Sequence, residues 1–236
     1  MAYHEVAPPE RLRELAECLW ISEGPRRTRV VPDGCMDLVE LDGDVVVAGP
    51  DTGSHLSAQQ VRATGLRFRP GTLPRLLGVP AAGLSDQRIP LAELHPSVSG
   101  APLLSAARRL LDNEPSATTA PWSLPLLQEV TARLGAGEAV QAVADQAGYS
   151  ARNLQRQCTA VYGYPPATLR RVLRFRRALG MVRAGVAVGD AAVEAGYADQ
   201  PHLYRDVRDL AGVPLSQLLS GAKRSTDVPA GSVTVA

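Results

Sequence analysis

The sequence contains few cysteines, and they do not form a recognisable framework. Only Cys18, Cys35 and Cys158 occur in 236 residues; they are scattered and their number is odd. This spacing argues against a disulfide framework and against a zinc site. A chain without disulfides suits a reducing compartment, so we expect a cytoplasmic protein.

Long hydrophobic runs are also missing. Mean hydropathy is −0.06, and apolar stretches such as 45–48 are far too short to cross a bilayer. The first residues, MAYHEVAPPERLREL, place no apolar segment behind a basic start, so we expect neither a signal peptide nor membrane association. No nucleotide-binding or Ser/His/Asp signature is present. We therefore expect no enzyme activity and no cofactor.

Neither sign of charge dominates the chain, but its two parts differ. The net charge is +1, and the basic residues are 24 arginines and one lysine. Residues 1–137 hold 13 arginines against 16 acidic residues, whereas residues 138–236 hold 12 basic against 8 acidic residues. A basic C-terminal part suits a module that binds nucleic acid. The preference for arginine over lysine indicates a GC-rich genome, and we do not interpret it as a binding signal.

The first part of the chain predicts a β-rich fold after a short helix. Apolar residues at helical spacing predict that helix over Glu10–Trp20. The Asp42-Gly43 pair between two β-prone runs predicts a hairpin. The predicted strands are Arg29–Val31, Met36–Leu41, Val45–Ala48 and Val61–Phe68, and short helical turns are predicted at Leu73–Gly78 and Leu91–Leu94.

The pattern changes after a connector rich in Ser, Thr and Pro. We expect a β-rich domain over 1–96, a linker with a short helix (Leu103–Leu111) over 97–122, an all-α domain over 123–222 and a disordered tail over 223–236. The predicted fold class is therefore α+β multidomain, with seven helices in the second domain. These helices are Leu124–Leu134, Val140–Ala147, Ala151–Tyr162, Ala167–Ala184, Val188–Ala195, Pro201–Leu210 and Leu215–Leu219.

The helical part contains an internal repeat. The segment ADQAGY at 144–149 matches AVEAGY at 192–197, and after one inserted residue the match continues at an offset of 49. Each copy reads as a helix, a tight turn at Ala-Gly-Tyr and a second helix that ends at a glycine. This is the helix-turn-helix pattern. Ser150 and Asp199 are good N-caps for the second helices.

The second helix of each copy has an apolar stripe and a polar stripe. The apolar stripes are Leu154, Cys158 and Val161, and Leu203, Val207 and Leu210. The polar residues are Arg152, Gln155, Arg156 and Thr159 in the first copy, and Gln200, His202, Tyr204, Arg205 and Arg208 in the second. Arginine pairs with guanine and glutamine with adenine in the major groove. Two such stripes in the same register favour base reading over a solvated helix face.

The helix between the copies carries six arginines. Its 18 residues over Ala167–Ala184 would span about 27 Å. A spacer of that size could hold two reading helices about one turn of DNA apart. We expect some of its arginines to contact phosphate and others only to solvate the helix; they are Arg170, Arg171, Arg174, Arg176, Arg177 and Arg183.

At residues 124–221 the chain resembles the DNA-binding domain of the AraC/XylS family of bacterial transcriptional regulators. The second copy is similar to the family signature at Gly196, Asp199, Gln200, His202, Leu203, Arg205, Gly212, Pro214 and Leu218, and the first at Ala144, Gly148, Tyr149, Ser150, Leu154, Arg156, Gly163 and Pro165. The chain departs from the family at Cys158 and Val207, where phenylalanine is usual. Smaller side chains bury less apolar area, which predicts a less stable domain.

The resemblance implies two recognition helices in adjacent major grooves on one face of DNA. The implied base readers are Arg152, Gln155, Arg156, Gln200, His202 and Arg205. The implied contacts to the DNA backbone are Ser150, Thr159, Tyr204 and Arg208.

The segments RVVPDGCMDLVELDGDVVVAGP and TGLRFRPGTLPRLLGVPAAGLSD resemble a small N-terminal domain found in a subset of these regulators. In the wider family a sensing or dimerising β-domain, often cupin-like, occupies this position. The histidines His4, His55 and His95 show no clustered ligand spacing, which argues against a metal-binding cupin.

Several charged residues of this N-terminal part have two interpretations. Asp33, Asp37 and Glu40 flank the hairpin; we expect them to cap turns or face solvent, and binding of a polar ligand is the alternative. Arg67 and Arg69 alternate with apolar residues, which predicts the solvent-facing side of a strand.

The leading hypothesis is a sequence-specific transcriptional regulator that binds double-stranded DNA. Its N-terminal domain would act through homodimerisation or through an unknown small-molecule effector, and RNA polymerase is a further expected partner. One alternative is a DNA-directed alkyl-transfer repair protein, which needs a reactive cysteine with zinc-ligating partners; Cys18 and Cys35 stand alone. The other is a non-specific DNA-bending protein, for which the positive charge is low.

Overall fold

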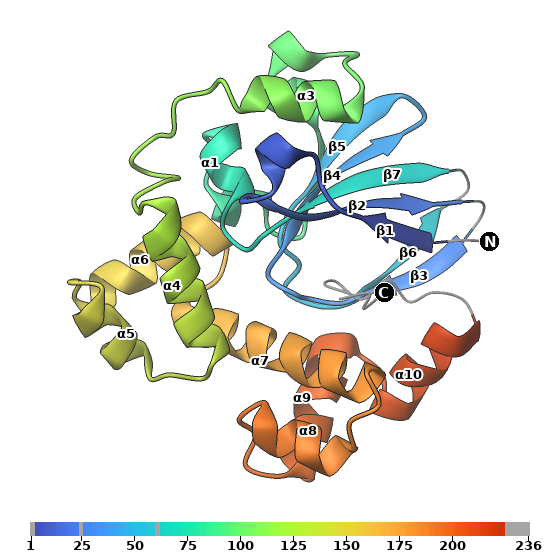
Figure 1. Ribbon diagram of the computed structural model, residues 1–236, viewed down its shortest axis with the longest axis vertical. Coiled ribbons are helices and arrows are strands. Elements are labelled where there is room, and N and C mark those ends of the chain that lie inside the picture. The colour runs from blue at the N-terminus through green and yellow to red at the C-terminus, as the bar shows by residue number, and fades with distance from the viewer. Residues whose placement is uncertain (1–2, 24–25, 60–61, 225–236) are drawn as a thin grey trace.

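A computed structural model describes residues 3–23, 26–59 and 62–224. Strands occupy the N-terminal part and helices the C-terminal part, and the two pack against each other (Figure 1). The predicted α+β organisation is therefore confirmed.

A six-stranded antiparallel sheet forms the centre of the N-terminal part. Its strand order is β1-β2-β7-β4-β5-β8. The strands are β1 (Tyr3–Val6), β2 (Ala16–Ser22), β7 (Ala63–Phe68), β4 (Met36–Leu41), β5 (Asp44–Ala48) and β8 (Arg88–Pro90). The predicted hairpin is present between β4 and β5, where Asp42 and Gly43 adopt φ angles of 51° and 88°. Two positive φ angles in succession suit the tight turn of a twisted hairpin.

A second, two-stranded sheet lies beside the first. Its strands β3 (Arg26–Val30) and β6 (His55–Gln59) pair antiparallel with each other. The β5–β6 loop, which we define as residues 49–54, leads from the large sheet to the small one.

The prediction of a helix over Glu10–Trp20 is wrong. The chain forms a 3-10 turn, η1 (Glu10–Leu12), and then enters strand β2. Strand β2 pairs with β1 on one side and with β7 on the other, and Leu12, Leu15 and Ala16 are buried in the core beneath the sheet. Apolar spacing across the turn and the start of the strand imitated a helical stripe, and long-range strand pairing decided the outcome.

Short helices cover the large sheet. They are α1 (Leu73–Leu77), η2 (Ala81–Leu84), α2 (Leu91–Leu94), η3 (Pro96–Val98) and α3 (Leu103–Leu110). Helix α3 lies within the predicted linker, and its residues Leu103, Ala106 and Leu110 are buried in the core of the sheet. Glu40 Oε2 accepts a hydrogen bond of 2.6 Å from the backbone N–H of Leu103, so Glu40 caps the start of α3. This contact with a distant helix differs from the predicted cap of a turn beside the hairpin.

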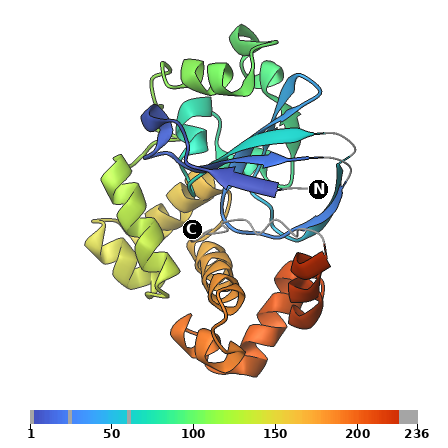
Figure 2. The same cartoon turned by 45° about the vertical axis from the view of Figure 1, so that its right-hand side comes forward.

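All seven predicted helices of the C-terminal part are present, and only the last differs in length by more than two residues. They are α4 (Leu124–Gly135), α5 (Val140–Gln146), α6 (Ala151–Tyr162), α7 (Pro166–Arg183), α8 (Val188–Glu194), α9 (Gln200–Ala211) and α10 (Leu215–Arg224). They form two lobes with separate cores, at opposite ends of α7 (Figure 2). Helix α7 contributes Leu169 to the first core and Phe175 to the second. It is the common spacer of both lobes.

The β5–β6 loop contacts the C-terminal ends of both α6 and α9. Tyr164, just after α6, donates a hydrogen bond of 2.5 Å from its hydroxyl to the backbone carbonyl of Asp51. Ser54 donates one of 2.7 Å to the carbonyl of Ala211, the last residue of α9, and Arg29 donates another of 3.2 Å to the same oxygen. One loop therefore holds the ends of two helices that belong to different lobes.

Candidate nucleic-acid interface

Both sequence repeats fold as a helix, a glycine turn and a second helix. In the first copy, Gly148 has φ 73° and Tyr149 N–H donates to Ala144 O at 2.9 Å. In the second, Gly196 has φ 90° and the equivalent bond from the amide of Tyr197 is also 2.9 Å. A positive φ is easily adopted only by glycine, which explains its presence in both turns.

The second helix of each copy begins at the predicted cap. Ser150 Oγ accepts a hydrogen bond of 3.2 Å from Asn153 N–H at the start of α6. Asp199 Oδ1 accepts one of 2.7 Å from His202 N–H at the start of α9. Both predicted apolar stripes are buried, including Cys158 and Val207 at the two departures from the family pattern.

The opposite faces of α6 and α9 carry the residues predicted to read bases. Arg152, Gln155, Arg156 and Arg205 are exposed, and Gln200 and His202 are partly exposed. Arg156 donates 2.8 Å to Asn153 Oδ1, and Gln200 donates 2.6 Å to the hydroxyl of Tyr204. The side chains of Arg152 and Arg205 form no hydrogen bond or ion pair with any residue that the structure describes. Long donor side chains are thus displayed on both helices.

The four residues predicted to contact the DNA backbone are differently placed. Arg208 and Tyr204 are exposed on α9. The Ser150 hydroxyl accepts the capping bond from Asn153 N–H, which does not use its own proton. The Thr159 hydroxyl donates a hydrogen bond of 2.9 Å to Gln155 O, so in this conformation its proton is not available to another acceptor.

The arginines of α7 are mostly engaged within the protein, which the sequence did not reveal. Arg171 and Arg174 each donate 2.7 Å to a different carboxylate oxygen of Asp206 on α9. Arg174 also lies over the ring of Tyr197, 4.2 Å from its centroid. Arg176 points to the N-terminal part, where it donates to Glu17 at 2.7 and 2.8 Å. These arginines position helices and domains.

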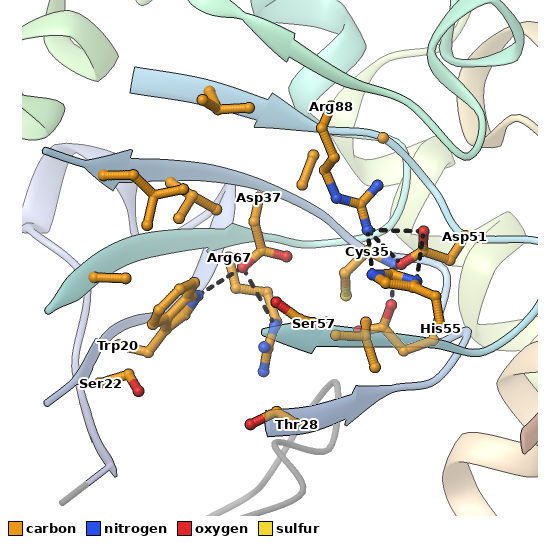
Figure 3. Close-up of a pocket in the computed structure, with 18 of the residues that line it drawn as sticks. Trp20, Ser22, Thr28, Cys35, Asp37, Asp51, His55, Ser57, Arg67 and Arg88 are labelled. Atoms are coloured by element: carbon orange, nitrogen blue, oxygen red, sulfur yellow. Dashed lines mark hydrogen bonds and ion pairs between the residues drawn. The ribbon is translucent and has the colours of Figure 1, made fainter. Parts of the chain in front are cut away.

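A cavity of about 550 Å³ lies in the N-terminal part, between the large and small sheets (Figure 3). Asp33, Asp37 and Arg67 are among the residues that line it. The prediction that Arg67 faces solvent is wrong: its side chain is 6% exposed and lies 3.4 Å from Glu5 and 3.7 Å from Asp37. Asp33 is buried and does not face solvent, but its Oδ1 accepts a hydrogen bond of 2.9 Å from Cys35 N–H, which is the turn-capping role that the sequence predicts.

The three thiols are poor nucleophiles. Cys18, Cys35 and Cys158 are all buried and free. Burial raises the pKa of Cys18 and of Cys158 to about 12, and raises that of Cys35 as well. A thiol with so high a pKa holds almost no thiolate at neutral pH. Within the described residues, no group of His, Cys, Asp and Glu side chains is arranged to hold a metal ion.

Comparison with known families matches both parts of the chain. Residues 4–90 match a domain of unknown function (DUF6597), and residues 143–221 match a helix-turn-helix domain family. The chain carries an AraC-type helix-turn-helix domain. The matched region, residues 143–221, includes both glycine turns and helices α6 and α9. This domain supports DNA binding by the chain.

Among solved structures, this chain is similar to ToxT from Vibrio cholerae O395. The identity is 8%, the match covers 88% of this chain and 97% of that one, and the TM-score is 0.49. A structure of ToxT bound to (E)-4-(8-methylnaphthalen-1-yl)but-3-enoic acid gives 8% identity, 93% and 99% coverage and the same TM-score of 0.49. No curated protein matches the sequence significantly. Within the described residues, no helix has the length and apolar character that a bilayer crossing requires.

Proposed function

We propose that the protein is a sequence-specific transcriptional regulator whose helices α6 and α9 read two adjacent major-groove segments of one DNA site. The observation that carries this proposal is the pair of equivalent helices, each with exposed arginines at matching positions (Arg156 and Arg205). Helix α7 has 18 residues and spans about 27 Å, which is of the order of one DNA turn, about 34 Å. Its ion pairs with α9 support a fixed spacing between the two reading helices.

The spacing can be tested without knowing the operator beforehand. Genome-wide recovery of DNA fragments bound by the full chain, followed by motif finding, is expected to give two half-motifs about one helical turn apart. Affinity for that site should fall steeply with salt, because phosphate contacts release counterions. A single uninterrupted short motif, or equal affinity for the recovered site and random DNA, would contradict the proposal.

Substitution of Arg156 or Arg205 tests the assignment of the two readers. Arg156→Ala or Arg205→Ala is expected to cost about 1–3 kcal/mol of binding free energy and to relax base preference in one half-site only. Binding of each variant to a DNA library randomised in each half-site measures both the affinity and the base preference. The control is Arg108→Ala, an exposed arginine on α3. Loss of melting temperature with unchanged base preference would instead assign both residues to helix stabilisation.

The N-terminal part is proposed to regulate this DNA binding, through a small-molecule effector or through homodimerisation. Residues 1–137 have more acidic than basic residues, so the region is poorly suited to bind phosphates itself. The cavity between its sheets is of a size that holds small ligands, and favours the effector route. Sedimentation of the full chain, with and without operator DNA, tests dimerisation. Transcription with purified RNA polymerase tests whether the polymerase is the partner.

The alternative of DNA-directed alkyl transfer has little support, because each cysteine thiol is buried with a raised pKa. Non-specific DNA bending is separated from specific reading by the randomised-library experiment above.

A further inference from the structure

The N-terminal part holds the two helical lobes in different ways. The first lobe, α4 to α6, is closely packed against it. A Cβ at Gly163, which ends α6, would lie 2.6 Å from Pro50 Cγ, and a Cβ at Gly71 of the N-terminal part would lie 2.7 Å from Val161 Cγ1 on α6. Tyr164, just after α6, is buried and donates its hydroxyl proton to Asp51 O. The end of α6 is therefore fixed by contacts that leave no room for a methyl group.

The second lobe, α8 to α10, is held at the end of α9 by hydrogen bonds. Arg29 on β3 and Ser54 in the β5–β6 loop both donate to the carbonyl of Ala211, over 3.2 and 2.7 Å. Arg29 also donates 3.2 Å to Ser54 Oγ. Gly212 is the repeat equivalent of Gly163, and the atoms nearest to a Cβ built there are the ends of these two side chains, at 3.1 and 3.7 Å. We call Arg29, Ser54 and Ala211 the α9 latch.

The acceptor of the α9 latch is a carbonyl that its own helix cannot use. The last carbonyls of an α-helix have no N–H partner within the helix, and Ala211 is fully buried. A buried carbonyl without a donor is destabilising, whereas a positive charge at a helix C-terminus is favourable. Val31, two residues after Arg29, is buried in the core of the second lobe. Strand β3 and the β5–β6 loop therefore stabilise one position of α9, in which its end reaches the small sheet.

Helix α9 is thereby held at two points along its length. Asp206 accepts hydrogen bonds from Arg171 and Arg174 of α7, and Ala211 accepts from the N-terminal part. Five positions separate Asp206 from Ala211, which is a rise of about 7.5 Å along the helix. A helix held at one point can tilt about it, and a second point removes this freedom. The direction of α9 relative to α6 thus depends on the α9 latch as well as on α7.

The small sheet carries the α9 latch on one face and the cavity on the other. Successive residues of a strand point to opposite faces of its sheet. Thr28 and Val30 of β3 line the cavity together with their pairing partners on β6 (Figure 3). Arg29 lies between them in the strand and donates to α9 on the opposite face. A displacement of the cavity face of β3 would therefore also move the α9 latch.

We propose that Arg29 and Ser54 are positioning residues for the second reading helix. Through the carbonyl of Ala211 they fix the direction of α9 relative to α6, and so set the half-site spacing that the protein accepts. The small sheet is then the element through which a ligand in the cavity would change that spacing. The consequence for DNA rests on the proposed function, whereas the position of α9 can be measured in the free protein, so the two can fail separately.

Distances between spin labels in the full chain, without DNA, test the α9 latch directly. One label pair, Ala142→Cys on α5 and Val193→Cys on α8, joins the two lobes, and a second pair, Arg108→Cys on α3 and Ala142→Cys, joins the N-terminal part to the first lobe. These positions are exposed, whereas the three natural thiols are buried and their pKa is raised, so the introduced cysteines react with the label. Combining Arg29→Met with Ser54→Ala is expected to widen the first distance distribution at least about twofold, because α9 gains further orientations, and to leave the second unchanged.

Ser57→Ala is the matched control for Ser54→Ala, because it removes a hydroxyl from the cavity face of the same small sheet. It should leave both distance distributions as in the wild type. If the latch variant leaves the first distribution unchanged, α7 alone fixes α9; if it widens both, the whole N-terminal part has loosened. Either result would overturn the proposal. Ser54→Ala alone gives the same test, with a smaller widening, if the double variant does not fold.

Binding to DNA sites of altered spacing tests the consequence for recognition. The two half-motifs of the recovered site are moved together or apart by one or two base pairs, and the affinity of the full chain is measured for each site. The wild type is expected to prefer the natural spacing, and the variant with Arg29→Met and Ser54→Ala to lose about fivefold or more of that preference, with base preference inside each half-site unchanged. A general loss of stability would lower the affinity for all spacings alike. An unchanged spacing preference in the folded variant would overturn the proposal, whereas a wild type without any spacing preference would contradict the proposed function.

Discussion

Replacing Gly49 with alanine is expected to destabilise the protein by more than about 3 kcal/mol. A Cβ at this position would lie 1.6 Å from the backbone oxygen of Leu84 and 2.5 Å from its carbonyl carbon. The clash is with main chain, so no side-chain rotation can relieve it. The Gly49 amide also donates 3.0 Å to Gln87 O, which ties the two segments together. Chemical unfolding of wild type and variant measures the loss.

Gly53→Ala is the matched control, because Gly53 lies in the same β5–β6 loop and an added Cβ would meet nothing within 4 Å. We expect its unfolding free energy to stay within about 0.5 kcal/mol of the wild type. Gly49→Ala should also weaken DNA binding, since displacement of the loop disturbs the ends of α6 and α9. Equal stability of the two variants would show that the loop tolerates movement at Gly49.

Asp206→Ala is expected to cost about 3–5 kcal/mol of folding free energy, and to weaken DNA binding most in the half-site that α9 reads. Asp206 is 6% exposed and accepts hydrogen bonds from Arg171 and Arg174 on α7. Its removal leaves Arg174, whose side chain is 18% exposed, without its carboxylate. Asp209→Ala removes only an exposed ion pair with Arg171, at 2.8 Å, and should cost less than about 1 kcal/mol. Similar losses for both variants would refute a special role for the buried pair.

The difference in folding free energy between wild type and Asp206→Ala is expected to depend on pH. Burial raises the pKa of Asp206, but the hydrogen bonds from Arg174 and Arg171 outweigh burial and hold the pKa below its ordinary value. A lowered folded-state pKa stabilises the protein above the ordinary carboxylate pKa, and this stabilisation is lost as pH falls through the folded-state pKa. The difference between wild type and Asp206→Ala should therefore be constant from about pH 8 to about pH 5, and shrink only below about pH 4.

The helical part was predictable because its information is local. A glycine turn, a cap and an apolar stripe recur within each copy, and all three can be identified from the residue spacing alone. The pairing of Arg171 and Arg174 with Asp206 was not predictable, because it joins residues more than 30 positions apart. The sequence therefore divided the six arginines of α7 only between phosphate contacts and solvation of the helix.

The N-terminal part was less predictable because long-range pairing determines it. Strands β1, β6 and β8 are short and gave no sequence signal, and β2 was mistaken for helix. Arg67 looked solvent-facing from its alternation with Leu66 and Phe68. Its burial follows from a central strand with both faces covered, by the helices beneath the large sheet and by the small sheet above it. The cavity exists only once these two sheets are assembled.

The β5–β6 loop belongs at once to the cavity, through Asp51, and to the ends of both reading helices, through Asp51 and Ser54. Coupling between two binding sites is reciprocal. If a ligand in the cavity changes the affinity for DNA by some factor, DNA changes the affinity of the cavity for that ligand by the same factor. Operator DNA can therefore be used to detect the effector. A ligand too weak to detect with the free protein could be detected on the protein–DNA complex if it favours the DNA-bound arrangement, and one that opposes that arrangement would be detected only without DNA.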